Sequence, residues 1–408
     1  MNDRVTHVWQ QRVDVTAADR LFTTRFFTMC GFTFTVFLSA FQLLPTAPFR
    51  ILDLGGSTFA SGLFLGFLTY ASALSAPLTG ALGDRVGHRR ILVTSSLAIA
   101  ILTTSYAILD DYRVVLTLVI VHGVFWSGLL SASAAYLTSA VPEARRAEGL
   151  AYWGLSSIGA IAIAPTVGFW IYRHGWRWLC AETVALNALM AIIAASLNEA
   201  PQKGTAALSG APGVSKGLLE WRVLIVSFTL FLYSFSYGGI TSFAALYARE
   251  NGTTPESLYL TLLGIVILIS RPAAGRLADR LGYRRLLIPS LVFITAGLTL
   301  LAFRGTRAWT VASAVVFGLG FGTSYPVFVA HVLRDIEATR RGAAFGAILS
   351  AFDIGIGTGS IAIGWIAERV GFNRAFGVAA ALSALALPYF LAVDRKTGPS
   401  ISRRAIRS

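Results

Sequence analysis

The feature that most constrains this chain is a series of long apolar stretches separated by short charged segments. A helix needs roughly 20 mostly apolar residues to cross a bilayer, because no water satisfies its backbone groups there. Three stretches reach spanning length only by including a charge within them: about 177–198 with Glu182, 257–275 with Arg271 and 342–367 with Asp353. Nine others contain no Asp, Glu, Lys or Arg: 26–49, 54–83, 91–109, 114–142, 149–172, 223–248, 286–303, 308–333 and 375–393. The sequence therefore predicts an all-α membrane protein with twelve transmembrane helices.

Composition supports a membrane protein over a soluble one. The 408 residues are 55% hydrophobic and 13% charged, whereas soluble domains carry about 25% charged residues. The net charge of +14 could suggest nucleic-acid binding. The basic residues lie in short loops between apolar runs, however, and that distribution is typical of membrane orientation. We therefore expect the lipid bilayer, and no nucleic acid, as a partner.

The charges of the connecting segments predict the orientation. An even number of helices places both termini on one side of the membrane. Most of the 34 lysine and arginine residues fall in the two tails and in the loops on that side, and positively charged loops favour the cytoplasm. The sequence therefore predicts cytoplasmic termini. Residues 1–25 are polar and mixed in charge, so no cleavable signal peptide is expected.

A flexible linker is predicted near the middle of the chain. Residues 199–220 (EAPQKGTAALSGAPGVSKGLLE) are rich in Gly, Ala, Pro and Ser, a composition typical of linkers. They fall between the sixth and seventh predicted helices. We expect an N-terminal six-helix bundle over 1–198, a cytoplasmic linker over 199–221 and a C-terminal six-helix bundle over 222–408.

Two short basic segments indicate that the two halves are related. GALGDRVGHRR begins at Gly80 and GRLADRLGYRR begins at Gly275, 195 residues later. Arginine pairs at 145–146 and 340–341 follow the fourth and tenth predicted helices with the same offset. A structural duplication explains both pairs.

These segments resemble the signature loop of the major facilitator superfamily, Gly-x-x-x-Asp-Arg-x-Gly-x-Arg-Arg, which joins the second and third helices. The helix number and the linker position agree as well, so the resemblance covers nearly the whole chain. It implies two pseudo-symmetric six-helix bundles around a central cavity, the major facilitator fold. The matching residues are Gly80, Asp84, Arg85, Gly87, Arg89 and Arg90, and Gly275, Asp279, Arg280, Gly282, Arg284 and Arg285.

In the resembling family this loop latches the two halves in the outward-facing state. Glycines at both ends allow tight packing and a sharp turn. An aspartate at a helix end beside arginines can form a charge-assisted network with a neighbouring helix terminus. We expect a gating role for both loops. The alternative is that their arginines only set the topology.

Nothing in the sequence points to ATP hydrolysis or to an enzyme. The chain has only three lysines, and none follows a glycine as a phosphate-binding loop requires. Cys30 and Cys180 lie in apolar stretches and the five histidines are scattered, so no metal, cofactor or nucleophile–base site is indicated. We expect a secondary transporter driven by an ion or solute gradient.

The fifth predicted helix contains GLSSIGAIAIAPTVG, which resembles the family's antiporter motif, a glycine-rich stretch ending in Gly-Pro-x-x-Gly. The match rests on Gly154, Gly159, Pro165 and Gly168, and Ala164 departs from it. Small residues let helices approach closely and proline bends the helix. The resemblance implies export. Plain helix packing and import stay open as alternatives.

Ionisable groups at bilayer depth are functional candidates because they are expensive to place there. Asp353 lies 12 residues past Arg341, about 18 Å into its helix at 1.5 Å per residue, and is a candidate proton carrier. His122 lies nine residues past Arg113, about 14 Å into its helix and one turn from Trp126. It is a second protonatable candidate. A hydrogen-bonded packing role is the alternative for both.

Glu182 and Arg271 are weaker candidates for proton coupling or substrate contact. Glu182 lies near the outer end of the sixth helix and could reach the interface. Arg271 precedes the second basic loop, so we expect it to snorkel toward the cytoplasmic surface or to join the loop network. Many proton antiporters of the family have an arginine at the position of Val119. We therefore expect protons to couple at His122 and Asp353 instead.

The resemblance places the first, fourth, seventh and tenth helices around the cavity. Aromatic side chains with a few polar groups suit a small amphipathic organic molecule, although the same residues could simply pack helices together. The candidates are Phe41, Gln42, Trp126, Tyr233, Tyr237 and Tyr325.

Residues 43–57 (LLPTAPFRILDLGGS) and 236–252 (SYGGITSFAALYARENG) are similar to the bacterial arabinose-efflux-like, drug–proton antiporter-like branch of the family. That branch includes predicted exporters of sugars, drugs and metal-chelating small molecules. The resemblance implies a monomeric, proton-coupled exporter of a small organic solute in a bacterial inner membrane. A proton-coupled importer would share this architecture. A non-transporting receptor should carry a large soluble domain or signalling tail, and none is seen.

Overall fold

The computed structural model describes residues 21–198, 221–303, 306–334, 336 and 341–397. The predicted linker over 199–220 and Arg340 of the second arginine pair lie outside the described residues. The described chain is helical throughout, with a short 3-10 turn, η1, over Glu143–Arg145. Its α-helices are α2 (Thr24–Asp53), α3 (Thr58–Val86), α4 (His88–Ile108), α5 (Tyr112–Ala140), α6 (Arg146–Tyr172), α7 (Trp176–Ser196), α8 (Trp221–Glu250), α9 (Leu258–Leu281), α10 (Tyr283–Ala302), α11 (Arg307–Arg334), α12 (Arg341–Val370) and α13 (Phe372–Thr397).

All twelve of these helices are long and apolar enough to cross a membrane, which confirms the predicted all-α architecture. Their outer faces carry large exposed apolar side chains, among them Ile101, Trp170 and Ile192. A soluble monomer rarely exposes so much contiguous apolar surface. The exposed apolar belt therefore fits contact with lipid.

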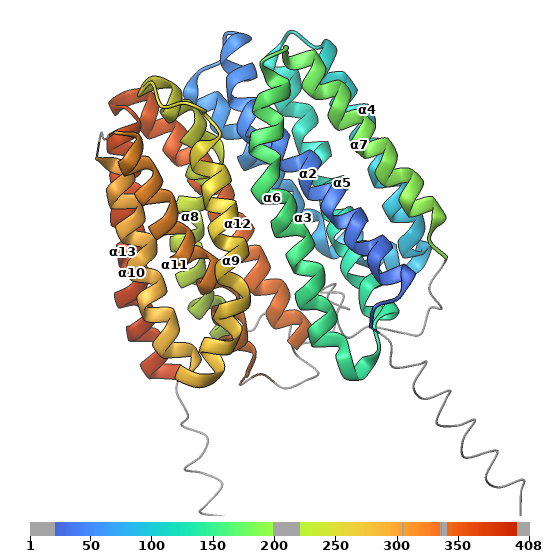
Figure 1. The fold of residues 1–408 in the computed structure, drawn as a ribbon. Helices are drawn as coiled ribbons and strands as arrows, with labels where there is room; N and C mark the ends of the chain where they lie inside the picture. The colour runs from blue at the N-terminus through green and yellow to red at the C-terminus, as the bar shows by residue number, and fades with distance from the viewer. Residues whose placement is uncertain (1–20, 199–220, 304–305, 335, 337–340, 398–408) are drawn as a thin grey trace, which may run out of the picture.

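The helices form two groups that lie side by side (Figure 1). Within α2–α7, α2 packs on α6 and α7, α3 on α5, and α4 on α5 and α7. Within α8–α13, α8 packs on α12 and α13, α10 on α11 and α13, and α9 on α11. We call these groups the N-half and the C-half. They meet through α3 and α12, α6 and α9, and α2 and α8.

Both the start of α2 and the end of α13 lie at the lower end of the bundle in Figure 1, which we call the terminal side. The opposite end is the far side. There Ser57 caps the start of α3, and its hydroxyl accepts a hydrogen bond from the Ala60 N–H. Such a cap satisfies one of the backbone donors that a helix start leaves free.

One-residue glycine turns reverse the chain within both basic loops. Gly87 joins α3 to α4 with φ 104° and ψ 134°, and Gly282 joins α9 to α10 with φ 88° and ψ 142°. Positive φ of this kind is costly for any residue with a Cβ atom. The expectation that these glycines permit a sharp turn is therefore confirmed at both repeat-related positions.

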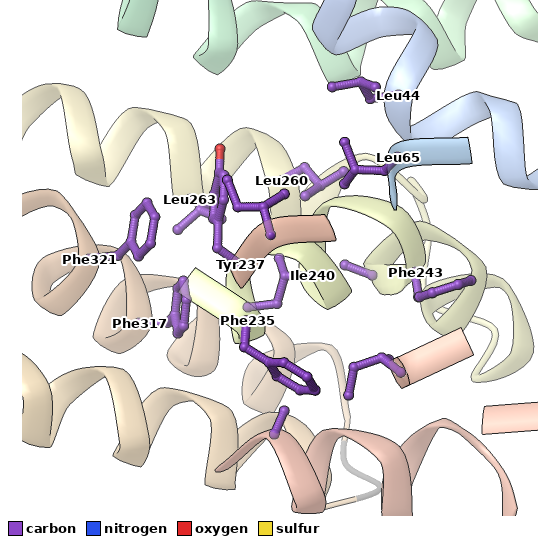
Figure 2. Close-up of a cluster of buried hydrophobic side chains, with 14 of the residues drawn as sticks. Leu44, Leu65, Phe235, Tyr237, Ile240, Phe243, Leu260, Leu263, Phe317 and Phe321 are labelled. Atoms are coloured by element: carbon purple, nitrogen blue, oxygen red, sulfur yellow. The ribbon is translucent and has the colours of Figure 1, made fainter. Parts of the chain in front are cut away.

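The C-half core is built around α8, the most enclosed of the twelve helices. Phe235, Tyr237, Ile240 and Phe243 of α8 all lie in the cluster drawn in Figure 2, which neighbouring helices complete. Hydroxyl groups in this interior bond to backbone carbonyls one turn earlier, as Thr241 does to Tyr237. The interior therefore stays packed while its polar groups are satisfied.

Candidate functional site: a charged cavity between the two halves

A cavity of about 280 Å³ lies at the centre of the molecule, between the two halves. Eight helices line it, namely α2, α3, α5, α6, α8, α9, α11 and α12. Seven of the ten residues predicted for the cavity or for proton coupling are brought together there. The predicted residues in its wall are Phe41, His122, Trp126, Tyr237, Arg271, Tyr325 and Asp353.

Two side chains of opposite charge face this cavity from the C-half. Asp353 comes from α12 and Arg271 from α9. We expected Arg271 to reach the surface, but its guanidinium carbon lies 5.7 Å from the centre of the Tyr325 ring, in the cavity wall. Among the described residues neither charge has a salt-bridge partner. The site thus holds two charges that no neighbouring side chain neutralises.

Aromatic rings make up much of the remaining wall. In the N-half, the Phe37 ring lies 5.9 Å from that of Phe41 and 5.6 Å from that of Trp126. In the C-half, the Tyr237 ring stacks on Phe321 at 4.3 Å. These pairs lie at separations typical of favourable ring contacts. The N-half wall of the cavity is therefore largely aromatic and apolar, and both charges come from the C-half.

His122 forms part of the N-half wall and is buried. Its Nδ1 lies 3.2 Å from the Tyr106 hydroxyl, and the two rings are stacked at 6.0 Å. Tyr106 is held in turn, because the Trp176 indole donates to its backbone carbonyl at 2.8 Å. His122 therefore combines a cavity position with a fixed ring orientation.

Three predicted residues lie outside the cavity lining. Tyr233 is fully buried in the C-half core. Gln42 turns away from the cavity and donates to Glu182 through Nε2 at 3.1 Å, which ties α2 to α7. Gln42 Oε1 and Glu182 Oε2 are buried without a hydrogen-bond partner. The structure thus pairs a predicted cavity residue with a predicted proton candidate, in the interior of the N-half.

The antiporter-like motif on α6 is packed unevenly. A Cβ atom added at Gly154 would meet no heavy atom within 4 Å, and at Gly159 only the edge of Phe34. At Gly168 it would press on Gln42 of α2. Close helix approach therefore explains Gly168, and it does not explain Gly154 or Gly159 in this conformation. Pro165 lines a small second pocket shared with Phe41 and Tyr237.

The basic loops anchor the last helix of each half. Arg89 donates to the carbonyl of Ala195 at the end of α7, at 2.6 Å. The repeat-related Arg284 pairs with Asp394 of α13, at 3.0 Å. Asp394 also lies 2.9 Å from His331 of α11. In the first loop Asp84 lies 3.7 Å from His88.

Hydrogen bonds between the halves gather toward the far side. The Ser360 hydroxyl donates to the Gly62 carbonyl at 2.8 Å, and Tyr70 bonds to Thr358 at 2.8 Å. Thr166 of α6 bonds to Thr261 of α9 at 2.7 Å. At the far end of α2, the Arg249 guanidinium lies 4.0 Å over the Phe49 ring. These contacts close the far side above the cavity.

Several lining residues were not predicted. Thr69, Ser157 and Phe352 lie on α3, α6 and α12, which the resemblance had not placed around the cavity. Phe37, Thr241 and Phe321 lie on helices that it had placed there. Helices α3, α6, α9 and α12 contribute to the wall as well. A polar residue at mid-span of those helices was the available signal, and it would have found Thr69 and Ser157. The cavity residues not predicted include Phe37, Thr69, Ser157, Thr241, Phe321 and Phe352.

No group of three or more His, Cys, Asp or Glu side chains in the described part of the chain could hold a metal ion. The cavity offers binding surface and protonatable groups, and no assembled catalytic centre is apparent among its lining residues.

Comparison with known proteins agrees with this architecture. The family model for the Major Facilitator Superfamily matches residues 26–251 and 226–407. An uncharacterised MFS-type transporter of Burkholderia pseudomallei is 26% identical over 374 residues, covering 89% of this chain and 90% of the relative. An uncharacterised MFS-type transporter of Methanocaldococcus jannaschii is 22% identical, covering 86% and 93%.

Solved structures match at the level of the fold. The nucleoside transporter NupG aligns with a TM-score of 0.73 at 15% identity, covering 91% of this chain and 99% of its own. The human organic anion transporter MFSD10 aligns with a TM-score of 0.68 at 14% identity, covering 90% and 100%. The matched proteins are transporters and not enzymes. This chain therefore belongs to the major facilitator superfamily, as a multi-pass membrane protein that acts as a secondary transporter of a small molecule.

Proposed function

We propose that this transporter exports a small organic solute in exchange for protons, by alternating access of the central cavity. The observation that carries the proposal is Asp353, a carboxyl group in the cavity wall with no salt-bridge partner among the described residues. A carboxylate in such a place must bind a proton or a cationic group to be stable. Exchange of a proton for a cationic group of the solute at Asp353 couples proton entry to solute export.

His122 is the second proton candidate. It faces the same cavity from the N-half, so a proton on either group acts on a solute bound between them. The position that many proton antiporters fill with arginine is Val119, which is buried here. Coupling in this chain is therefore assigned to the His122 and Asp353 pair.

The conformation suits loading from the terminal side. Contacts between α3 and α12 close the far side, and we assign the terminal side to the cytoplasm because the basic loops lie there. In this proposal the chain acts as a monomer in a bacterial inner membrane, with bundles over 1–198 and 222–408 joined by a cytoplasmic linker. Asp84 and Asp279 with their arginines then latch the terminal side in the opposite conformation.

Import is the second candidate, and one feature favours it. The antiporter-like motif on α6 has Ala164 where glycine is usual, and two of its glycines have open space around them. The two similar structures are named for nucleosides and organic anions, and these names do not indicate whether this chain imports or exports its solute.

Inverted membrane vesicles with an acidified lumen test the proposal. We expect wild-type vesicles to accumulate at least one member of a panel of labelled amphipathic solutes, and a protonophore to abolish the accumulation. Asp353→Asn should lose gradient-driven accumulation and keep solute exchange between the two sides. Accumulation that instead requires right-side-out vesicles and an inward proton gradient would establish import.

A further inference from the structure

We infer that the transported solute is a zwitterion with an apolar body, held by Arg271 at its anionic group and by Asp353 at its cationic group. The inference rests on the proposed exchange of solute for protons, and it names the chemical class of the solute. The observation that carries it is that Arg271 and Asp353, two opposite charges without a salt-bridge partner among the described residues, face one cavity whose N-half wall holds three aromatic rings.

The first step concerns the two charges. The guanidinium carbon of Arg271 lies 5.7 Å from the centre of the Tyr325 ring. Phe352 precedes Asp353 in the chain, and its ring lies 5.0 Å from the same Tyr325 ring. Arg271 and Asp353 both line the cavity, yet they form no salt bridge with each other or with another described residue. Because a charge in an enclosed site is stable only when it is compensated, the ligand must supply both counter-charges.

The second step concerns exchange. When Asp353 carries a proton, the net charge of Arg271 and Asp353 together is +1. When Asp353 is ionised and a zwitterion is bound, the net charge of Arg271, Asp353 and the solute is zero. The two charges of the solute then pair with the two charges of the protein. The ammonium of the solute replaces the proton on the carboxylate, and that proton leaves to the solution. A purely cationic solute would lie beside an unpaired Arg271, and a purely anionic one beside an ionised Asp353.

The third step concerns the body of the solute. The N-half wall contains Phe37, Phe41 and Trp126, and the Phe37 ring lies 5.9 Å from the Phe41 ring and 5.6 Å from the Trp126 ring. The volume of about 280 Å³ is just below the range of ligand pockets, about 300 to 1,000 Å³. A compact molecule with one aromatic or branched apolar part fits these limits.

Four indole compounds separate charge from shape in a binding assay on the purified full chain. Tryptophan and glycyl-tryptophan are zwitterions with short and longer charge separation, tryptamine is a cation and indole-3-propionate is an anion. We expect at least one zwitterion to raise the thermal unfolding temperature more than either singly charged probe. Arg271→Gln should shift the preference to tryptamine, and Asp353→Asn should shift it to indole-3-propionate.

Each variant removes one of the two charges and leaves the other, so each is the control for the other. Equal or stronger stabilisation by a singly charged probe, or no stabilisation by any of the four, overturns the zwitterion assignment. Preferences that stay unchanged in both variants overturn the assigned roles of Arg271 and Asp353. The assay measures binding without a gradient, so its result is independent of the vesicle experiment that tests export.

Discussion

The backbone N–H of Phe59, in the first turn of α3, donates to the Glu368 carboxylate of α12 at 2.7 Å. The contact joins the two halves at the far end of the bundle. The start of a helix leaves backbone donors unsatisfied and carries partial positive charge. Glu368 therefore caps a helix of the other half, and the cap must be lost whenever α3 and α12 separate on this side.

Glu368→Gln should weaken far-side closure, because it replaces a charged acceptor with a neutral one. We expect the closed-to-open ratio of the far side to fall by about two- to five-fold, as suits an exposed contact with a helix terminus. Distances between spin labels at the far ends of α3 and α12 report this ratio. Glu256→Gln, on the far-side loop between α8 and α9, is the matched control and should leave the distances unchanged. An unaltered distance distribution in Glu368→Gln would show that the Glu368 contact does not stabilise far-side closure.

A second prediction concerns the closest approach of α3 and α12. A Cβ atom on Gly62 would overlap the carbonyl oxygen of Ser360, and that residue's hydroxyl donates to the Gly62 carbonyl. Gly62→Ala should separate the helices at an overpacking cost of about 1–3 kcal/mol. We expect the same labels to show a loss of far-side closure of about fivefold or more. Gly154→Ala adds the same methyl group to α6 in open space, so it should behave as wild type; an equal loss in both variants would contradict the packing argument.

The fold was predictable because its signals are long and repeated. Twelve apolar runs, each about long enough to cross a bilayer, leave few arrangements open. The repeat of 195 residues between Gly80 and Gly275 then fixed the symmetry. Even the turns followed, since Gly87 and Gly282 adopt the positive φ that the motif suggested.

The site was less predictable, because facing directions within a bundle depend on packing that one sequence does not record. Asp353 and His122 were found by depth alone, and both line the cavity. The position of Arg271 near the end of its helix predicted a surface side chain, but its long side chain turns into the cavity. Gln42 sits one residue from Phe41, yet the 100° step between neighbouring helix positions points it at Glu182.

The pairing of Gln42 with Glu182 gives a third prediction. Glu182→Ala would leave the buried Gln42 amide with no partner, which should lower the free energy of unfolding by about 1–3 kcal/mol. Glu182→Gln keeps a hydrogen-bonding amide of the same size, so its thermal unfolding in detergent should stay close to that of wild type. Equal destabilisation by both substitutions would mean that the carboxylate itself is required.

The same pair of variants separates structure from coupling. If Glu182 only ties α2 to α7, Glu182→Gln should transport at the wild-type rate in energised vesicles. A stable Glu182→Gln protein that exchanges solute but fails to accumulate it would instead make Glu182 part of the proton path.

The last prediction concerns the second basic loop. Gly282 has φ 88° and ψ 142°, a region open almost only to glycine. Gly282→Ala should therefore lower the free energy of unfolding by about 1–3 kcal/mol. Gly275 lies within α9, and a Cβ atom there would meet no heavy atom within 4 Å. Gly275→Ala should leave stability unchanged or raise it by up to about 1 kcal/mol. Thermal unfolding of the two purified variants measures this contrast.

Transport by Gly275→Ala then tests the gating role of the loop. The space around Gly275 is open in the conformation closed on the far side. If the loop packs against the other half when the terminal side closes, the added methyl group will obstruct only that second state. A stable Gly275→Ala protein should then transport several-fold more slowly and favour far-side closure in the label distances. Wild-type transport with wild-type distances would contradict the gating role. The loops would then only set the topology and make the contacts of Arg89 and Arg284 within each half.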